Sequence, residues 1–356
     1  MDKIRVAIML PGKPIGGVGT IIKKLTVGMH LEGFDAELLV LSEKLLKTLA
    51  SDISNINRLK MFDAVIYGGS LPLPSSLLIR EYVRTMLFIH GYVRHERTFA
   101  IKHGGLNKKL SALARSILWQ TSMTSHRIDK FMCICKTACE MSGIRENYIL
   151  LPEFILPGEE RCYERLSKES RKDSHENKDA TKILTYTSYA RSPRLLSTQH
   201  VEHLMKMVSR QVNKKVELII INPQLKTEAL KPIGNITIRY IKPLPRVEFL
   251  RLLANSDLFI ELNIDEELRD STVEAALLGI PVAKLTHPLF KERCDYKEDD
   301  LIQVYSFKEL ANKISEYIRN IKFYYDMYSK ALRDFILKHR TWNNVKRQLV
   351  EYLKET

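Results

Sequence analysis

Short apolar runs alternate along the first half of the chain with stretches in which apolar residues recur at helical spacing. The runs are nearly continuous rather than interrupted by polar residues, which is typical of parallel strands covered by helices on both faces. We therefore expect strands at residues 4–10, 36–41, 64–67, 86–90 and 131–135. The spacing between these runs predicts helices at residues 18–31, 75–83 and 108–119.

The same alternation begins again after residue 182. Apolar runs predict strands at residues 183–187, 216–221, 236–240, 258–262, 282–285 and 301–305. Helical spacing predicts helices at residues 195–210, 246–254, 271–278, 307–319, 321–337 and 342–353. Two series of alternating elements predict an α/β protein of two doubly wound, Rossmann-like domains. Because ligands of such sheets bind beyond the carboxyl ends of the strands, we expect the two domains to face a shared cleft.

A polar segment without apolar periodicity separates the two series and covers residues 167–180. We predict an N-terminal domain over residues 1–168, a linker over 169–181, a C-terminal domain over 182–337 and a final helix over 338–356. The length of 356 residues agrees with two domains, since one domain typically holds about 100–200 residues.

The composition is that of an ordinary globular protein. Hydrophobic residues make up 45% of the chain and charged residues 28%, which excludes a disordered protein. The longest apolar runs are far shorter than the ~20 residues that a membrane-spanning helix requires. The first residues lead directly into a predicted strand without an apolar signal region, so we expect a cytoplasmic protein.

The five cysteines form no recognisable disulfide framework. Cys133 and Cys135 lie in an apolar run, and Cys139 follows shortly after them. A metal site is one interpretation of this cluster, but no histidine stands near it at the spacing of a zinc site. We expect buried free thiols and no metal, in agreement with a reducing compartment.

The formal net charge is +14, and a large part of the basic excess lies between residues 80 and 130. This balance indicates an anionic partner: phosphate groups, nucleic acid or an anionic membrane surface. Arg94, Arg97 and Lys102 belong to a stretch that mixes cations with apolar residues at helical spacing. Basic amphipathic surfaces dock on anionic membranes, so we assign these residues to an acceptor or peripheral membrane side. An ordinary helix packed on its sheet is the alternative.

Glycines stand between the first predicted strand and the first predicted helix, with Gly16 and Gly17 directly before the helical pattern. Glycines permit close approach of the backbone, and a helix N-terminus offers free N–H groups to a phosphate. The spacing differs from the G-x-G-x-x-G fingerprint of dinucleotide-binding proteins. We expect phosphate or sugar binding here, and a tight strand-to-helix turn is the alternative.

Carboxylates gather after the predicted strand at residues 258–262. Glu266 lies in the polar loop that follows the strand, and Glu274 lies in the next predicted helix. Carboxylates at the carboxyl end of a strand are well placed to accept hydrogen bonds from sugar hydroxyls. A structural alternative for Glu274 is a capping box, in which the Ser271 hydroxyl caps the helix and Glu274 reaches back to the backbone.

The spacing Glu266-x7-Glu274, followed by Ala-Ala-Leu-Leu-Gly-Ile-Pro-Val, resembles the signature of GT-B glycosyltransferases of the group 1 type, family 4. The resemblance implies that Glu266 binds hydroxyls of the donor sugar and takes part in catalysis, and that Glu274 binds the ribose of the nucleotide. Two further likenesses extend it over nearly the whole chain. Gly16-Gly17-Val-Gly is similar to the family's glycine turn, and residues 341–352 are similar to a C-terminal helix that crosses back onto the first domain.

Other segments resemble positions around the donor. His90, in Phe-Ile-His-Gly, is similar to the family's strand-end histidine beside the donor sugar, which implies a catalytic role; a structural histidine is the alternative. The family carries a Gly-Arg and a Lys after the first strand of its second domain; here Arg194 falls at the Lys position, whereas Tyr189 takes the Arg position and Arg191 lies two residues further on. Paired hydrogen bonds suit arginine to a diphosphate, so Arg191 and Arg194 are assigned to it. A solvated loop charge is the alternative for both. The sequence departs from the family at residues 267–269, Glu-Leu-Arg instead of Gly-Phe-Gly.

The resemblance implies a hexosyltransferase that moves a sugar from a UDP- or GDP-linked donor to a hydroxyl of a glycan, lipid or protein acceptor. It implies retention of anomeric configuration without a metal or other cofactor, and the chain contains no Asp-x-Asp pattern of the metal-holding kind. Three alternatives stand beside it: an inactive relative, an epimerase-like relative and a basic nucleic-acid-binding protein. No nucleic-acid motif is present, so we expect no nucleic-acid partner.

Overall fold

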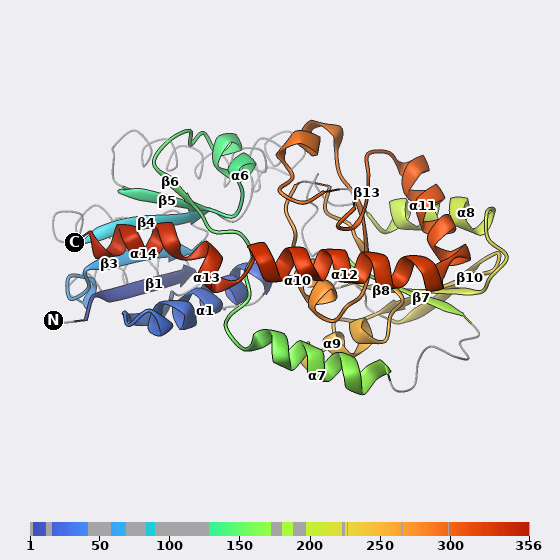
Figure 1. Cartoon of the computed structure of the whole chain (residues 1–356), viewed down its shortest axis with the longest axis horizontal. Coiled ribbons are helices and arrows are strands. Elements are labelled where there is room, and N and C mark those ends of the chain that lie inside the picture. The colour runs from blue at the N-terminus through green and yellow to red at the C-terminus, as the bar shows by residue number, and fades with distance from the viewer. Residues whose placement is uncertain are drawn as a thin grey trace. The chain divides into compact units, whose positions relative to one another are not determined.

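The structure, a computed structural model, describes residues 3–11, 16–41, 58–68, 83–89, 128–171, 180–187, 197–222, 225, 227–264, 266–297 and 299–355. The chain divides into two compact units. The first comprises Met1–Leu156 together with Thr341–Thr356, and the second comprises Pro157–Arg340. Figure 1 gives the labels of the helices and strands.

The first unit is built on a parallel sheet with the strand order β2-β1-β3-β4-β5-β6. Its central strands are apolar on both faces and form the core of the unit, with Ile8, Ile66 and Phe88 fully buried. The strands are β1 (Arg5–Pro11), β2 (Asp35–Leu41), β3 (Ala64–Gly68), β4 (Arg84–Ile89), β5 (Lys130–Cys133) and β6 (Tyr148–Leu150).

The described helices of this unit come from both ends of its sequence. They are α1 (Gly16–Leu31), α6 (Lys136–Met141), α13 (Trp342–Val345) and α14 (Arg347–Lys354). Ile155 pairs with Thr341 in an isolated parallel bridge, and α14 packs against β6 (Figure 1). Arg84 of β4 donates a hydrogen bond of 2.6 Å to the Tyr352 carbonyl. The prediction that the last helix returns to the first domain is therefore confirmed.

The second unit is built on a mixed sheet with the order β13-β12-β11-β7-β8-β10-β9. All neighbouring strands are parallel except β9 and β10, which are antiparallel. The strands are β7 (Thr181–Tyr186), β8 (Val216–Ile221), β9 (Ala229–Ile233), β10 (Ile236–Ile241), β11 (Leu258–Glu261), β12 (Val282–Leu285) and β13 (Ile302–Val304). With β9 set aside, the strands follow the 3-2-1-4-5-6 order of a Rossmann sheet.

Helices connect these strands and cover the sheet. They are α7 (Glu159–Arg171), α8 (Thr198–Ser209), α9 (Arg246–Ala254), α10 (Asp270–Leu277), a 3-10 helix (Pro288–Arg293), α11 (Phe307–Arg319) and α12 (Ile321–His339). Crossovers of this kind explain why the strands read as continuous apolar runs, because both faces of the sheet are buried.

The predicted strands are all present, with ends shifted by one or two residues. The predicted helices that fall on described residues are present as well. The helix predicted at 108–119, and nearly all of the one predicted at 75–83, lie outside the described residues. The two doubly wound α/β domains expected from the sequence are confirmed.

The boundary between the units lies earlier than the sequence predicted. The expected N-terminal domain reached residue 168, whereas the second unit begins at Pro157 and includes α7. Two side-chain contacts explain this assignment. Ser167 donates a hydrogen bond of 2.9 Å to the Leu278 carbonyl, and Glu164 forms an ion pair with Arg333. The polar helix α7 is thus held by the second unit, and it covers the start of the predicted linker.

The expectation of buried free thiols is wrong for two of the three clustered cysteines. Cys133 and Cys139 form a disulfide, with their Cα atoms 5.8 Å apart. Cys133 ends β5 and Cys139 lies in α6, and the turn between these elements brings the two buried side chains together. Cys135 is the N-cap of α6, and its Sγ accepts a hydrogen bond from the Ala138 N–H at 3.4 Å.

Candidate functional site

The second sheet has a switch point between β7 and β11. From β7 the chain proceeds to β8 and β10 on one side of the sheet, and then returns to add β11 and β12 on the other. Connections leave the carboxyl ends of β7 and β11 in opposite directions, so ligands of doubly wound sheets bind at this position. The segment that contains Glu266 and Glu274 begins at the carboxyl end of β11.

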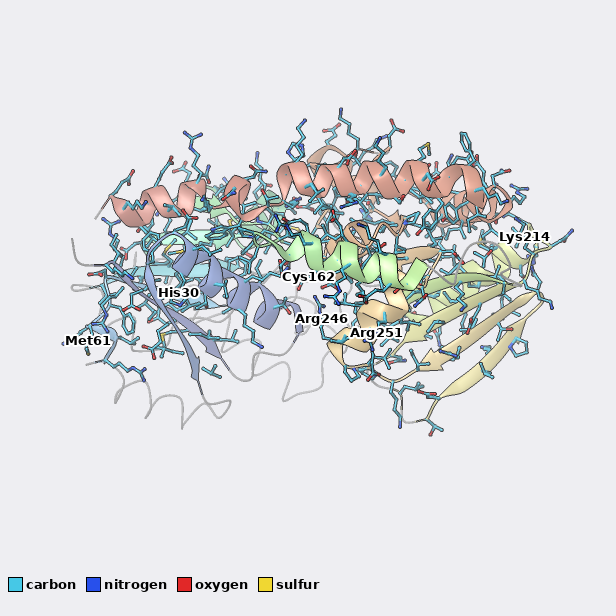
Figure 2. The ribbon with its side chains drawn as sticks, turned by 60° about the horizontal axis from the view of Figure 1, so that its bottom comes forward. His30, Met61, Cys162, Lys214, Arg246 and Arg251 are labelled. Carbon is cyan, nitrogen blue, oxygen red and sulfur yellow. A yellow bond between two sulfur atoms is a disulfide. The ribbon has the colours of Figure 1, made fainter. Side chains whose placement is uncertain are left out.

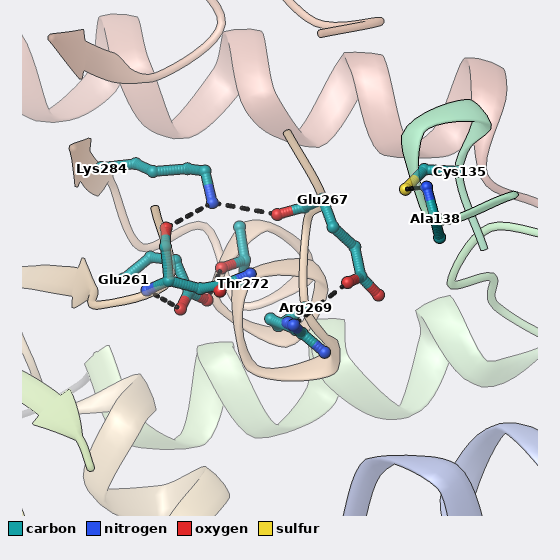
Figure 3. A network of polar contacts seen from close by, with 8 residues as sticks. Cys135, Ala138, Glu261, Glu267, Arg269, Thr272 and Lys284 are labelled. Carbon is teal, nitrogen blue, oxygen red and sulfur yellow. Dashed lines mark hydrogen bonds and ion pairs between the residues drawn. The ribbon is translucent and has the colours of Figure 1, made fainter. Parts of the chain in front are cut away.

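A buried carboxylate ties the end of β11 to α10. The Oε2 atom of Glu261 accepts a hydrogen bond of 2.7 Å from the Thr272 hydroxyl, in the first turn of α10. Its Oε1 atom accepts a hydrogen bond of 3.0 Å from the Asn263 backbone N–H. Glu261 therefore fixes both the start of the loop and the helix that follows it (Figure 3).

Lys284 of β12 holds the same loop from the neighbouring strand. Its side chain is fully buried, and its Nζ donates to the Asn263 carbonyl at 2.8 Å and to the Glu267 carbonyl at 3.0 Å. These carbonyls lie on either side of Glu266 in the sequence, so the lysine fixes the backbone that carries this carboxylate (Figure 3).

The three residues that replace the family's Gly-Phe-Gly form an ordered loop. Leu268 is buried, and Glu267 forms an ion pair of 3.2 Å with Arg269, the N-cap residue of α10. Glu266, directly before them, is 4% exposed. Its carboxylate and the Lys284 ammonium both act on the Cys294 thiol, whose pKa is raised by burial and by Glu266.

Glu274 does not form the capping box that was its structural alternative. Helix α10 begins one residue earlier than expected, its N-cap is Arg269, and no side chain caps it. Glu274 instead forms an ion pair through Oε1 with Arg246, the first residue of α9. Its side chain is 2% exposed, and its Oε2 atom is buried without a hydrogen-bond partner among the described residues.

Tyr163 of α7 is the third residue of the group formed with Glu274 and Arg246. The Arg246 guanidinium lies beside its phenol group. Burial raises the pKa of Tyr163 to about 12, although the nearby Arg246 guanidinium acts in the opposite direction. The tyrosine therefore stays protonated at neutral pH and serves as a neutral partner of the arginine.

Among the other predicted site residues, the structure describes Gly16 and Gly17. Both lie in the first turn of α1, which begins two residues earlier than the helix predicted at 18–31. In the first unit β1 lies between β2 and β3, so this helix also begins at a switch point. The remaining candidates lie outside the described residues: His90, Arg94, Arg97, Lys102, Arg191 and Arg194.

Sequence reasoning missed three contributors to this site: Glu261, Lys284 and Arg246. Glu261 and Lys284 each follow apolar residues inside a buried strand, and a charged residue in such a run is the signal that identifies them. No such signal exists for Arg246. Over the part of the chain that is described, no group of three or more metal-ligating side chains comes together.

No protein-family model and no curated protein matches the chain. Solved structures do resemble it over its full length. HepE of Anabaena, crystallised with UDP-glucose, superposes with a TM-score of 0.64 at 12% identity, over 99% of this chain and 100% of that one. Sucrose-phosphate synthase of Thermosynechococcus elongatus gives 0.65 at 10% identity, over 99% of each chain.

A third similar structure is a UDP-GlcNAc 2-epimerase of Neisseria meningitidis bound to UDP-GlcNAc. Its TM-score is 0.54 at 13% identity, over 99% of this chain and 100% of that one. Likeness at this level of identity shows the fold: the chain has the GT-B architecture of two Rossmann-like domains. None of its described helices is long and apolar enough to cross a membrane.

Proposed function

We propose that the protein is a glycosyltransferase that moves a sugar from a nucleotide-diphospho-sugar to an acceptor hydroxyl. The observation that carries this proposal is Glu274, a buried carboxylate near the switch point of a Rossmann-ordered sheet, with one oxygen lacking a partner among the described residues. A buried acceptor atom without a donor costs free energy, and a ribose hydroxyl supplies that donor. The solved structures of the same fold that contain UDP-glucose or UDP-GlcNAc support a nucleotide sugar as the ligand.

The proposed roles follow the family resemblance, residue by residue. Glu274 binds the ribose, and Glu266 binds hydroxyls of the donor sugar on a loop that Lys284 holds in place. We assign the donor sugar to His90 as well, and the diphosphate to Gly16, Gly17, Arg191 and Arg194. We assign the acceptor or an anionic membrane surface to Arg94, Arg97 and Lys102, which gives a cytoplasmic protein peripheral to the membrane.

Cleavage of the sugar–phosphate bond develops positive charge on the sugar ring and negative charge on the leaving diphosphate. We assign stabilisation of that negative charge to backbone N–H groups at the start of α1 and to the two arginines. With those groups in place the reaction needs no metal, and we propose that it retains the anomeric configuration of a transferred hexose. The departing phosphate then takes the proton of the acceptor hydroxyl.

Release of nucleoside diphosphate from a panel of UDP- and GDP-linked sugars tests the proposal. The wild type is expected to release it from one donor, because many transferases slowly hydrolyse their donor when no acceptor is present. Glu274→Gln should lose this release while its melting temperature stays close to that of the wild type. Glu248→Gln is the matched control, since Glu248 is an exposed glutamate of α9. Absence of release and of donor binding by calorimetry would reject the proposal in favour of an inactive relative.

A second candidate is an epimerase, which the similarity to the Neisseria enzyme favours. An epimerase inverts one carbon of the sugar, whereas a transferase moves the sugar to a new hydroxyl. Analysis of the sugar products by NMR separates these reactions: a transferase gives the free sugar or a glycoside with its original stereochemistry, and an epimerase gives the inverted one.

A further inference from the structure

Three helices of the second unit meet around one arginine. Helices α7, α9 and α10 pack against one another, and Arg246 stands at the first position of α9. Its guanidinium contacts Tyr163 on α7 and Glu274 on α10. The arginine side chain is 49% exposed, whereas Glu274 is 2% exposed. Figure 2 shows Arg246 on α9 beside Cys162 of α7, with Arg251 further along the same helix.

A carboxylate as buried as Glu274 requires a counter-charge. Transfer of an ionised carboxylate out of water is unfavourable unless a cation and hydrogen bonds compensate for the lost hydration. Arg246 is the cation that the structure pairs with it. The arginine supplies the counter-charge for an ionised carboxylate, in which both oxygens accept hydrogen bonds.

The two oxygens of the Glu274 carboxylate have different surroundings. Arg246 occupies Oε1, and Oε2 stays buried without a partner among the residues described. The same guanidinium also lies beside the Tyr163 phenol, so the arginine has neighbours on both α7 and α10. The contact ties Oε1 to the guanidinium and so limits the directions in which Oε2 can point.

We propose that Arg246 is a positioning residue for the nucleotide ribose: it orients Glu274 so that Oε2 accepts a hydrogen bond from a ribose hydroxyl. This inference rests on the proposed function and adds to it a residue that the family resemblance does not assign. Arg246 acts through Glu274, and Tyr163 acts through Arg246. The ligand feature that Arg246 controls is accordingly the pair of ribose hydroxyls, and not the base or the phosphates.

Two other roles are open to a half-exposed arginine at this place, and they predict different results. An arginine that contacts the diphosphate directly contributes equally to ligands with and without ribose hydroxyls. An arginine that only stabilises the fold changes the melting temperature without a selective effect on binding. The ratio of affinities for ligands with and without ribose hydroxyls therefore separates a positioning role from direct phosphate contact and from a purely structural role.

The experiment measures binding of UDP, GDP and their 2′,3′-dideoxy analogues by calorimetry. Wild-type protein should bind one of the natural diphosphates, and its dideoxy analogue about tenfold or more weakly, as expected for the loss of a hydrogen bond to a charged group. Arg246→Met should weaken binding of the natural diphosphate by a similar factor and leave the analogue within about twofold. Arg246→Lys should restore part of the difference, because it keeps the charge but not the fork.

Arg251→Met is the matched control, because Arg251 is an exposed arginine of the same helix; its affinities should equal those of the wild type. Tyr163→Phe is the second variant, in case Arg246→Met does not fold. It removes the hydroxyl group beside Arg246 and should reduce ribose selectivity about threefold.

The results distinguish the two proposals. Wild-type protein that binds neither diphosphate removes the proposed function and the inference with it. A second outcome is that the wild type selects the ribose ligand while Arg246→Met and Tyr163→Phe keep the same selectivity. This result overturns the inference about Arg246 and leaves the proposed function standing. Equal losses for the natural and dideoxy ligands in Arg246→Met overturn it in favour of direct phosphate contact.

Discussion

Gly28 of α1 lies directly beneath the indole of Trp342. A Cβ atom placed on Gly28 would come within 2.8 Å of the Trp342 ring, closer than carbon atoms approach. Trp342 is fully buried, its ring centre lies 5.1 Å from that of Phe154, and its Nε1 donates to Glu32 at 3.1 Å. This glycine therefore provides the space in which the C-terminal segment docks on the first unit.

Gly28→Ala should destabilise the first unit by about 1–3 kcal/mol, although alanine is the better helix former, because the added methyl group overpacks the site. Denaturant unfolding of the variant measures this cost. Gly28→Ala in a Trp342→Leu background should recover most of the loss, since the ring that the methyl group meets is gone. Equal costs in both backgrounds would show that the contact with Trp342 is not the cause.

Ser271→Ala should leave the free energy of unfolding within about 0.5 kcal/mol of the wild type. A capping box would lose about 1 kcal/mol with the same substitution, but the N-cap of α10 is Arg269 and Glu274 pairs with Arg246. Urea unfolding decides between these values. A loss near the larger figure would restore the capping role of Ser271.

Lys284→Met should destabilise the second unit by about 2–4 kcal/mol, because two buried carbonyls lose a charged donor. It should also lower kcat with the nucleotide sugar that the wild type uses, since the loop between Asn263 and Glu267 carries Glu266. Lys284→Arg should not rescue either property, because the larger guanidinium does not fit a fully buried ammonium site. Unchanged stability in the methionine variant would mean that the lysine does not hold this loop.

Cys294 should remain a thiol at pH values where an ordinary cysteine has begun to ionise. Burial and the Glu266 carboxylate raise its pKa, so its reactive thiolate appears only at higher pH. The pH dependence of alkylation by iodoacetamide, followed by peptide mass spectrometry, should give a midpoint above the ordinary value of about 8.5. Glu266→Gln should move this midpoint down. A midpoint at or below the ordinary value would contradict the raised pKa, and no shift in the variant would show that the Glu266 carboxylate does not contribute to it.

The fold could be predicted largely from the strands. Buried parallel strands such as β8 are continuous apolar runs, and that pattern has few other interpretations. The elements that the sequence did not predict lack such a continuous apolar run. The edge strand β9 is exposed along most of its length and contains a proline, and β6 is only three residues long. Helix α7 is so polar that no helix was predicted over its residues, and its last residues were assigned to the linker.

The site could be predicted only where its residues are close in sequence. Glu266 and Glu274 belong to one segment, and their spacing identified both. Arg246 is far from Glu274 along the chain, and only the packing of α9 on α10 brings the two together. The disulfide of Cys133 and Cys139 was missed for a related reason, because it depends on the direction in which the chain leaves β5.

The return of residues 341–355 to the first unit has a consequence for the order of events during synthesis. The ribosome makes β1 to β6 first, then the whole second unit, and only then the segment that carries Trp342. The nascent first unit must therefore wait, with the surface around Gly28 and Phe154 uncovered, until the intervening chain has been made. The second unit is continuous in sequence and is complete sooner, so it is expected to reach its native state on the ribosome before the first unit does.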